Sequence, residues 1–259
     1  TYPEALRLRG RLQFAAGHVF GRVAKSALAA VTAHAYEGGS STLSNQALLA
    51  LSLHKRILES GRPRELRPTC NESWYIQTDA CFEPESDYVL AGIGGVLFAP
   101  DGKPVAFFSQ QLNQQMIAAL NPGSRKTAIF ECEFFALFCA MLLWGSSASS
   151  ALVLYTDNNA VRDAMISCHT TNAVAKKILV AVLSLETELQ LAPWFARVPT
   201  DSNLADHPSR LEAELLLKMG AQRHELCAEE CWDVLLSRAG SWGDDLGIRT
   251  SQREKGSCA

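Results

Sequence analysis

Apolar residues recur at helical spacing in the first sixty residues of the chain. Three such stretches, at 4–16, 20–36 and 43–60, are separated by Gly17 and by the run Gly38-Gly39-Ser40-Ser41. Prolines at 63 and 68 then interrupt the pattern, because proline removes a helical hydrogen bond and restricts the residue before it. The pattern predicts three helices in residues 1–68, ending in a linker.

From Ser73 the apolar positions change to the spacing of strands. Strands are predicted at 74–81, 93–98 and 105–109, with a hairpin turn at Asp101-Gly102 between the last two. Helices are predicted at 127–144, from 158 and at 172–189, strands at 152–156 and 194–198, and a last helix from about 203. This order predicts an α/β fold with a mixed sheet and helices on its faces.

The 259 residues exceed the usual size of one domain, which is about 100–150 residues. We expect a domain at 69–215 between a helical segment at 1–68 and a tail at 216–259 that starts helical and is mobile from Gly240. The chain starts at Thr1 and contains neither a signal-like stretch nor an apolar run near 18 residues. We therefore expect an intracellular fragment of a longer protein, in cytoplasm or nucleus, neither secreted nor bound to a membrane.

Charge divides the chain more sharply than its net value of -3 indicates. Residues 1–68 hold ten basic against four acidic residues, whereas 69–210 hold eight against fourteen. A basic segment suits contact with a nucleic-acid backbone, but basic residues are also ordinary on solvated helix faces. Of the eight cysteines, those in apolar stretches suit buried free thiols. His224, Cys227 and Cys231 have zinc-like spacing without an evident fourth ligand, so an amphipathic helix is favoured there.

Four acidic residues stand at positions from which side chains can converge. Asp79 lies inside the first strand, Glu133 in the first turns of the long helix, Asp157 directly after the fourth strand and Asp206 near the start of the last helix. A carboxylate inside an apolar strand is costly to bury unpaired. Divalent cations offset that cost, because hard cations prefer carboxylate oxygens. The pattern therefore predicts a site for two metal ions that hydrolyses a phosphodiester.

The segments around these acids resemble the four motifs of the ribonuclease H family, in the family's order. They are Thr78-Asp79-Ala80, Glu133-Phe134-Phe135-Ala136, Thr156-Asp157-Asn158 and Asn203-Leu204-Ala205-Asp206-His207-Pro208-Ser209-Arg210. The resemblance implies a five-stranded mixed sheet with flanking helices. It also implies endonucleolytic cleavage of the RNA strand of RNA/DNA hybrids with two Mg²⁺ ions, for which Mn²⁺ can substitute. It carries the roles of metal ligand and catalytic group onto Asp79, Glu133, Asp157 and Asp206.

The last motif, after Arg197-Val198-Pro199, is similar to the reverse-transcriptase-linked domains of DIRS-type retrotransposons. Leu8-Arg9-Gly10-Arg11-Leu12-Gln13-Phe14-Ala15, followed by Phe20-Gly21-Arg22, looks like the thumb end of such a polymerase. The resemblance implies an upstream polymerase domain of the same polyprotein as partner. The sequence departs from many cellular members of the ribonuclease H family in two ways. Residues 199–205 contain no histidine, and no basic protrusion follows the helix after the fourth strand.

Several side chains are open to more than one interpretation. Asp157 could cap the helix that follows it. Glu131 competes with Glu133 for the site, and we interpret it as a solvated acid of the first helical turn. We expect contacts to nucleic acid from the helical segment at 1–68, which we call the arm, and from the residues after the fourth strand. Asn159 and Gln77 could equally meet water. The predicted set is Asn158, Asn159, Arg7, Arg9, Arg11 and Arg22. Trp144, Trp194 and Phe195 are predicted to lie in the core.

Two other functions compete with hybrid cleavage. Transposases and integrases use two aspartates followed by a late glutamate, whereas the order here is Asp, Glu, Asp, Asp. The second alternative is an inactive connection-like or nucleic-acid-binding module, which is expected to have lost some of the carboxylates. All four are present, which favours the enzyme.

Overall fold

The computed structural model of the protein describes residues 2–19, 21–36, 42–63, 72–84, 89–147 and 151–243. Its N-terminal part contains α1 (Tyr2–Ala16), α2 (Val23–Tyr36) and α3 (Asn45–Ser60), which confirm the three predicted helices. Small residues let α2 lie closely between the other two, since Ala24, Ala27 and Ala50 are all buried at this junction. The predicted glycine break at 38–41, Phe20 and most of the linker lie outside the described residues.

A six-stranded mixed sheet forms the centre of the remaining chain, in the order β5-β4-β1-β2-β3-β6. The antiparallel strands are β1 (Trp74–Pro84), β2 (Val89–Phe98) and β3 (Pro104–Gln111), and Gly102 takes a left-handed φ of 83° in the predicted turn. β4 (Leu152–Thr156) and β5 (Trp194–Arg197) run parallel to β1. The predicted α/β fold with a mixed sheet and flanking helices is thus present, and the sheet has six strands rather than the expected five because β6 (Gln222–Arg223) adds a two-residue strand beside β3.

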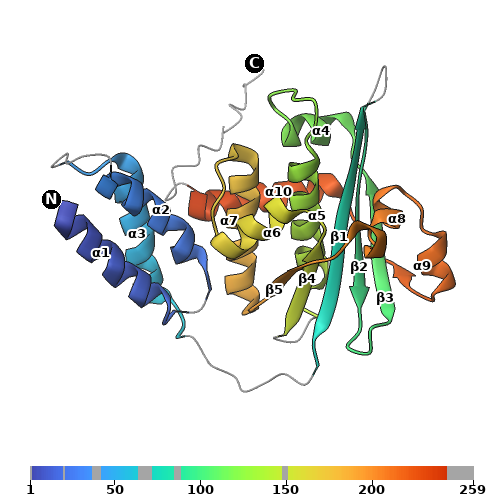
Figure 1. Ribbon diagram of the computed structural model, residues 1–259, viewed down its shortest axis with the longest axis horizontal. Helices are drawn as coiled ribbons and strands as arrows, with labels where there is room; N and C mark the ends of the chain where they lie inside the picture. The colour runs from blue at the N-terminus through green and yellow to red at the C-terminus, as the bar shows by residue number, and fades with distance from the viewer. Residues whose placement is uncertain are drawn as a thin grey trace, which may run out of the picture.

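Helices cover the two faces of the sheet unequally (Figure 1). One face carries α5 (Ile129–Trp144), with α6 (Asn159–Ser167), α7 (Ala173–Leu189) and α10 (Ala228–Gly243) around it. α5 is buried on nearly every side, because it packs on β1 and β2 and also on α7. The other face carries η1 (Thr200–Ser202), α8 (Asp206–Ser209) and α9 (Glu214–Lys218) over a smaller core that includes Phe107 and Leu216.

The structure corrects four predictions about these elements. The helix expected from about 203 is divided into α8 and α9, with a left-handed residue at Leu211 between them. α4 (Gln114–Leu120) was not predicted. Residues 240–243 are helical rather than mobile because they continue α10, whereas 244–259 lie outside the described residues. Trp194 is 72% exposed although it was predicted to lie in the core, because no described element covers its face of β5, while Trp144 and Phe195 are buried as predicted.

The N-terminal helices contact the rest of the protein where α2 begins. Arg22 donates from Nε to Glu186 Oε2 on α7 at 3.0 Å and from Nη1 to the Met165 carbonyl at 2.6 Å. Its guanidinium also lies 5.0 Å from the centre of the Phe195 ring. Gly21 permits this approach, because an added Cβ would meet Thr187 Oγ1 at 2.4 Å. A buried carboxylate and its arginine therefore connect the arm to the sheet domain.

None of the described helices has both the length and the apolar character needed to span a lipid bilayer.

Candidate active site

Three of the four predicted carboxylates meet beside the middle of β1, where β4 ends. Asp79 comes from the middle of β1, Asp157 directly follows β4, and Glu133 reaches them from the second turn of α5. One oxygen from each lies within 4.8 Å of one from each of the others. β1 and β4 are parallel neighbours, and α5 packs on β1, so the fold itself brings the three side chains together. The predicted convergence of these three is confirmed.

Burial and mutual repulsion disfavour charge on this cluster. Burial raises the pKa of Asp79 to about 7, and the nearby charges of Asp157 and Asp206 add to the rise. Burial likewise raises the pKa of Glu133 to about 8, although a hydrogen bond from Asn158 opposes the shift. Within the described part of the chain, no lysine or arginine forms an ion pair with Asp79, Glu133 or Asp157. Their negative charge is left for a cation to neutralise.

Hydrogen bonds orient Glu133 and Asp157. Asn158 Nδ2 donates to Glu133 Oε1 at 3.0 Å, and the Thr156 hydroxyl donates to the other oxygen at 3.3 Å. The Thr200 hydroxyl donates to Asp157 Oδ2 at 2.8 Å. Asn158 itself caps α6, accepting from the backbone N–H groups of its first turn. The open alternative for Asp157 is thereby settled, because the helix cap is the next residue.

Asp206, the fourth predicted carboxylate, has a different partner. Its Oδ1 accepts a hydrogen bond of 2.9 Å from Arg210 Nε, one turn along the chain, and Arg210 also pairs with Glu83 of β1. The pKa of Arg210 is raised by these two carboxylates. Asp206 lies near enough to affect Asp79 but does not belong to the cluster of three. The structure therefore brings together three of the four predicted residues and holds the fourth beside them.

Ser209 ties α8 to the cluster. Its hydroxyl lies 2.9 Å from Asp79 Oδ2 and 2.9 Å from the Asp206 carbonyl, and its own carbonyl accepts from Cys81 Sγ at 3.0 Å. Ser209 is fully buried. The sequence motif contains Ser209 and Arg210, but we assigned no role to either. The four-residue separation of Asp206 and Arg210 was the available signal, because it favours ion pairs on a helix.

Glycines of β2 allow α8 to lie directly on the sheet. Gly94 is the register partner of Asp79, and a Cβ added there would lie 2.4 Å from Ser209 N and 2.8 Å from the Ala205 carbonyl. We expect Gly94→Ala to displace α8, reducing cleavage and lowering the melting temperature by roughly 3–10 °C. Gly10→Ala on α1 is the matched control, since a Cβ there meets nothing within 4 Å. Thermal melts that are unchanged for Gly94→Ala would contradict this packing.

The raised pKa values of the cluster also predict how pH affects the metal-free protein. Asp79 and Glu133 bind protons more tightly folded than unfolded, so they stabilise the fold at about pH 4 and lose that contribution as pH rises through about 7 to 8. We expect the melting temperature in chelator to fall between pH 5 and pH 8. The fall should be smaller in Asp79→Asn/Glu133→Gln, which does not ionise there. Parallel pH profiles for the two proteins would contradict the shifts.

Glu131 is not the solvated acid that we predicted. It is 1% exposed, and its Oε1 accepts hydrogen bonds from Arg125 and from Asn172, the residue that caps α7. The helical spacing correctly placed Glu131 on a different face of α5 from the cluster. It did not reveal that the loop before α5 and the start of α7 cover this face. Glu131 therefore has a structural role, holding three segments together.

The residues predicted to contact nucleic acid divide into two groups. Arg22 and Asn158 have the internal partners already described, and Arg9 Nε donates to Thr32 Oγ1 at 2.9 Å. Gln77 accepts the backbone N–H of Leu204, which anchors the loop before α8. Arg7 and Arg11 are exposed on α1, and Asn159 is exposed at the start of α6. These three side chains remain available to an outside partner.

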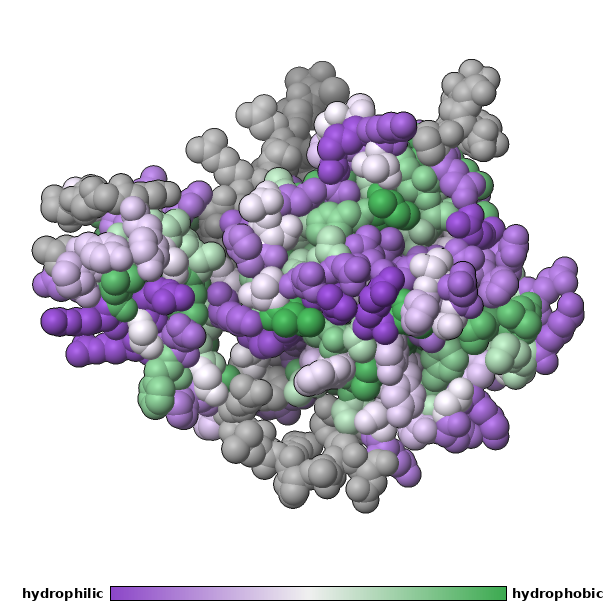
Figure 2. Space-filling model, in the orientation of Figure 1, coloured by the Kyte–Doolittle hydropathy of each residue, from purple (hydrophilic) through white to green (hydrophobic). Residues whose placement is uncertain are grey.

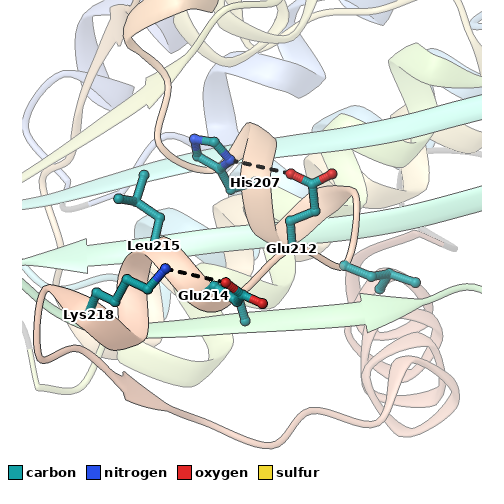
Figure 3. Close-up of a pocket in the computed structure, with 7 residues that line it drawn as sticks. His207, Glu212, Glu214, Leu215 and Lys218 are labelled. Atoms are coloured by element: carbon teal, nitrogen blue, oxygen red, sulfur yellow. Dashed lines mark hydrogen bonds and ion pairs between the residues drawn. The ribbon is translucent and has the colours of Figure 1, made fainter.

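An open pocket lies beside α8 and α9, apart from the carboxylates. Four of its lining side chains form two pairs (Figure 3): His207 Nδ1 lies 3.7 Å from Glu212 Oε2, and Lys218 Nζ lies 3.3 Å from Glu214 Oε2. None of the three clustered carboxylates lines it. His207 thus lines this pocket and pairs with Glu212 there.

Comparison with models of protein families gave no match, and comparison with curated proteins gave none either. Among solved structures, the chain is similar to RNase H1 of the archaeon Halobacterium salinarum, at 18% identity and a TM-score of 0.39, over 52% of this chain and 96% of that one. It is similar to LC11-RNase H1 from compost, solved with an RNA/DNA hybrid, at 16% and 0.42, over 56% and 99%. It is also similar to the N-terminal RNase H domain of a Mycobacterium tuberculosis protein, at 15% and 0.39, over 55% and 98%.

Proposed function

We propose that this protein hydrolyses the RNA strand of RNA/DNA hybrids, as an endonuclease that uses two divalent metal ions. The observation that carries the proposal is the cluster of Asp79, Glu133 and Asp157, which the ribonuclease H-like fold assembles from β1, α5 and β4. Asp206 on α8 is the proposed fourth ligand. We propose Mg²⁺ as the natural ion, with Mn²⁺ as a substitute.

The donor set fits such ions. It consists only of carboxylate oxygens, which are the ligands that Mg²⁺ and Mn²⁺ prefer. Asp79 and Glu133 are each 6% exposed and lack a cationic partner within the described residues, so their charge is costly without a bound cation. When bound, the ions would supply an activated water and neutralise the charge on the leaving oxygen.

The chain's own residues fix the geometry of that reaction. Thr156 and Asn158 hold both oxygens of Glu133, and Thr200 holds one oxygen of Asp157. Ser209 holds Asp79 and fixes α8 at the same time. Preorganised ligands favour the transition state because they need not reorganise when charge develops. Asn159, exposed at the start of α6 and two residues after Asp157, is the residue that we propose contacts 2′-hydroxyls, which distinguish RNA from DNA.

We propose that the arm supports the substrate and that the protein acts beside the polymerase domain of a retroelement polyprotein. One face of α1 and the turn after it carries Arg7, Arg11, Phe14 and His18, at spacings of four, three and four residues. Phe14 is 72% exposed, and its ring lies 4.4 Å from that of His18. Hydrophilic and a few hydrophobic side chains mix over these helices at the left of Figure 2. Such a surface suits a nucleic-acid backbone.

The arm's contribution can be measured with charge variants of the full chain. We expect Arg7→Gln/Arg11→Gln to weaken hybrid binding and to reduce the slope of log affinity against log salt by about 2. Lys55→Gln/Arg56→Gln on α3 is the control, since it removes equal charge from exposed positions of the same arm. Binding should be measured in Ca²⁺ to prevent cleavage. Equal effects of the two variants would mean that α1 makes no specific contact.

A panel of substrates tests the proposed activity. The protein is incubated with RNA/DNA hybrid, double-stranded RNA, double-stranded DNA and single-stranded RNA of one sequence, in Mg²⁺ and in Mn²⁺. We expect cleavage inside the RNA strand of the hybrid alone. Binding of hybrid without cleavage under any condition would instead favour the inactive nucleic-acid-binding module.

A further inference from the structure

The side chain of Asp206 is engaged by a cation that belongs to the protein. Arg210 Nε donates to Asp206 Oδ1 at 2.9 Å, while another nitrogen of the same guanidinium pairs with Glu83. Glu83 lies on β1, four residues beyond Asp79, so the two project from the same face of the strand. The Arg210 guanidinium thus bridges α8 and β1 at the border of the carboxylate cluster.

The backbone around Asp206 has little freedom to move. Arg210 N–H closes α8 on the Asp206 carbonyl at 3.2 Å, and the Ser109 hydroxyl donates to the Pro208 carbonyl at 2.7 Å. Gly94 lies against Ser209 without space for a Cβ. Asp206 can therefore change its partner only by turning its side chain. That side chain is 35% exposed, which leaves room for the turn.

We propose that Arg210 is a positioning residue, whose guanidinium keeps the Asp206 carboxylate away from the other three carboxylates. A second divalent ion would then replace this guanidinium as the partner of Asp206. This inference rests on the proposed function. Asp79, Glu133 and Asp157 would hold the first ion with only small side-chain movements, because their oxygens already lie within 4.8 Å of one another. Asp206 completes the site for the second ion only by exchanging the guanidinium for that ion.

Glu83 makes the exchange reversible. When Asp206 turns, Arg210 keeps its other carboxylate and is not left with an unpaired charge. The pair is half exposed, with the Arg210 side chain 46% accessible, so its hold on Asp206 is modest and a divalent ion can compete with it. A buried pair would block the second ion instead.

Metal binding without substrate tests this role directly. Binding of Mn²⁺ to the full chain is followed by electron paramagnetic resonance and calorimetry, in wild type, Arg210→Ala, Arg210→Met and Arg210→Lys. We expect two ions in each protein, with the second bound roughly three- to tenfold more tightly in the Ala and Met variants. The first ion should bind equally in all four. Arg210→Lys should resemble wild type, since it keeps the charge.

The controls separate this role from folding and from catalysis. Arg162→Ala removes an exposed ion pair with Asp163 outside the cluster and should leave both affinities unchanged. Arg210→Met keeps the aliphatic stem, so it remains informative if Arg210→Ala unfolds. An unchanged or weaker second ion in both variants overturns the proposal, as does a single ion in every protein. Two ions in a wild type that cleaves no hybrid would instead reject the proposed function and leave this inference standing.

Discussion

Replacing Glu133 with glutamine is expected to reduce cleavage of an RNA/DNA hybrid by at least about 1000-fold. The change removes one of three carboxylates that lie within 4.8 Å of one another, while Thr156 and Asn158 remain to hold the side chain. The loss should appear in the turnover rate, because ligand charge is needed for the chemical step. Single-turnover cleavage with saturating enzyme measures that step without a contribution from product release.

Glu131→Gln is the matched control for this variant. Glu131 lies two residues earlier on α5 and is also a buried glutamate, but its partners are Arg125 and Asn172. We expect it to lower stability by about 1–3 kcal/mol, because a buried charge-assisted network is weakened, while most cleavage is retained below the melting temperature. Similar losses of cleavage from the two substitutions would show that the cluster is not the reacting site.

Replacing Asp157 with asparagine is expected to abolish cleavage without lowering stability in metal-free buffer. The charge of Asp157 helps raise the pKa values of buried Asp79 and Glu133, so its removal relieves repulsion. The asparagine oxygen can still accept the Thr200 hydroxyl. At pH 8 in chelator we expect a melting temperature that is unchanged or about 2–4 °C higher.

Addition of Mg²⁺ should make wild type more stable than Asp157→Asn. Wild type gains stability from a ligand that binds only the folded state, whereas Asp157→Asn binds it weakly and gains less. A drop of many degrees for Asp157→Asn in chelator would mean that Asp157 is a structural group. That result would remove the physical basis for a metal site at this position.

The sheet and its helices could be predicted from the sequence because their signals are local. Alternating residues identified β1 to β5, and the apolar runs identified α5 and α7. β6 could not be found this way, since two residues are too short to show a period. Trp194 was misplaced because apolar character gives the hydrophobic phase of a strand but not whether another element covers it.

The three clustered acids could also be predicted, because each lies inside a strand or helix, or directly after one. The order of these elements along the chain determines their places in the fold. The partners that orient them could not. Thr200 meets Asp157 across 43 residues, and Ser209 meets Asp79 across 130. Such contacts depend on how η1 and α8 pack on the sheet, and Gly94 decides that packing through the absence of a side chain.

The arm shows the same limit for charge. Counting charged residues identified a basic segment. The count did not reveal that Arg22 would form an ion pair with Glu186, 164 residues away in the sequence. Arg7 and Arg11 are the arginines of α1 that the structure leaves exposed. A charge count therefore predicts the sign of a surface, whereas contacts decide which of its residues can act.

The most direct test is cleavage of an RNA/DNA hybrid, labelled on the RNA strand, by the full chain with Mg²⁺ and with chelator. We predict internal cuts that leave 3′-hydroxyl and 5′-phosphate ends, that stop in chelator and that are absent from Asp79→Asn. An intact RNA strand with Mg²⁺, or equal cutting by wild type and Asp79→Asn, would contradict the account.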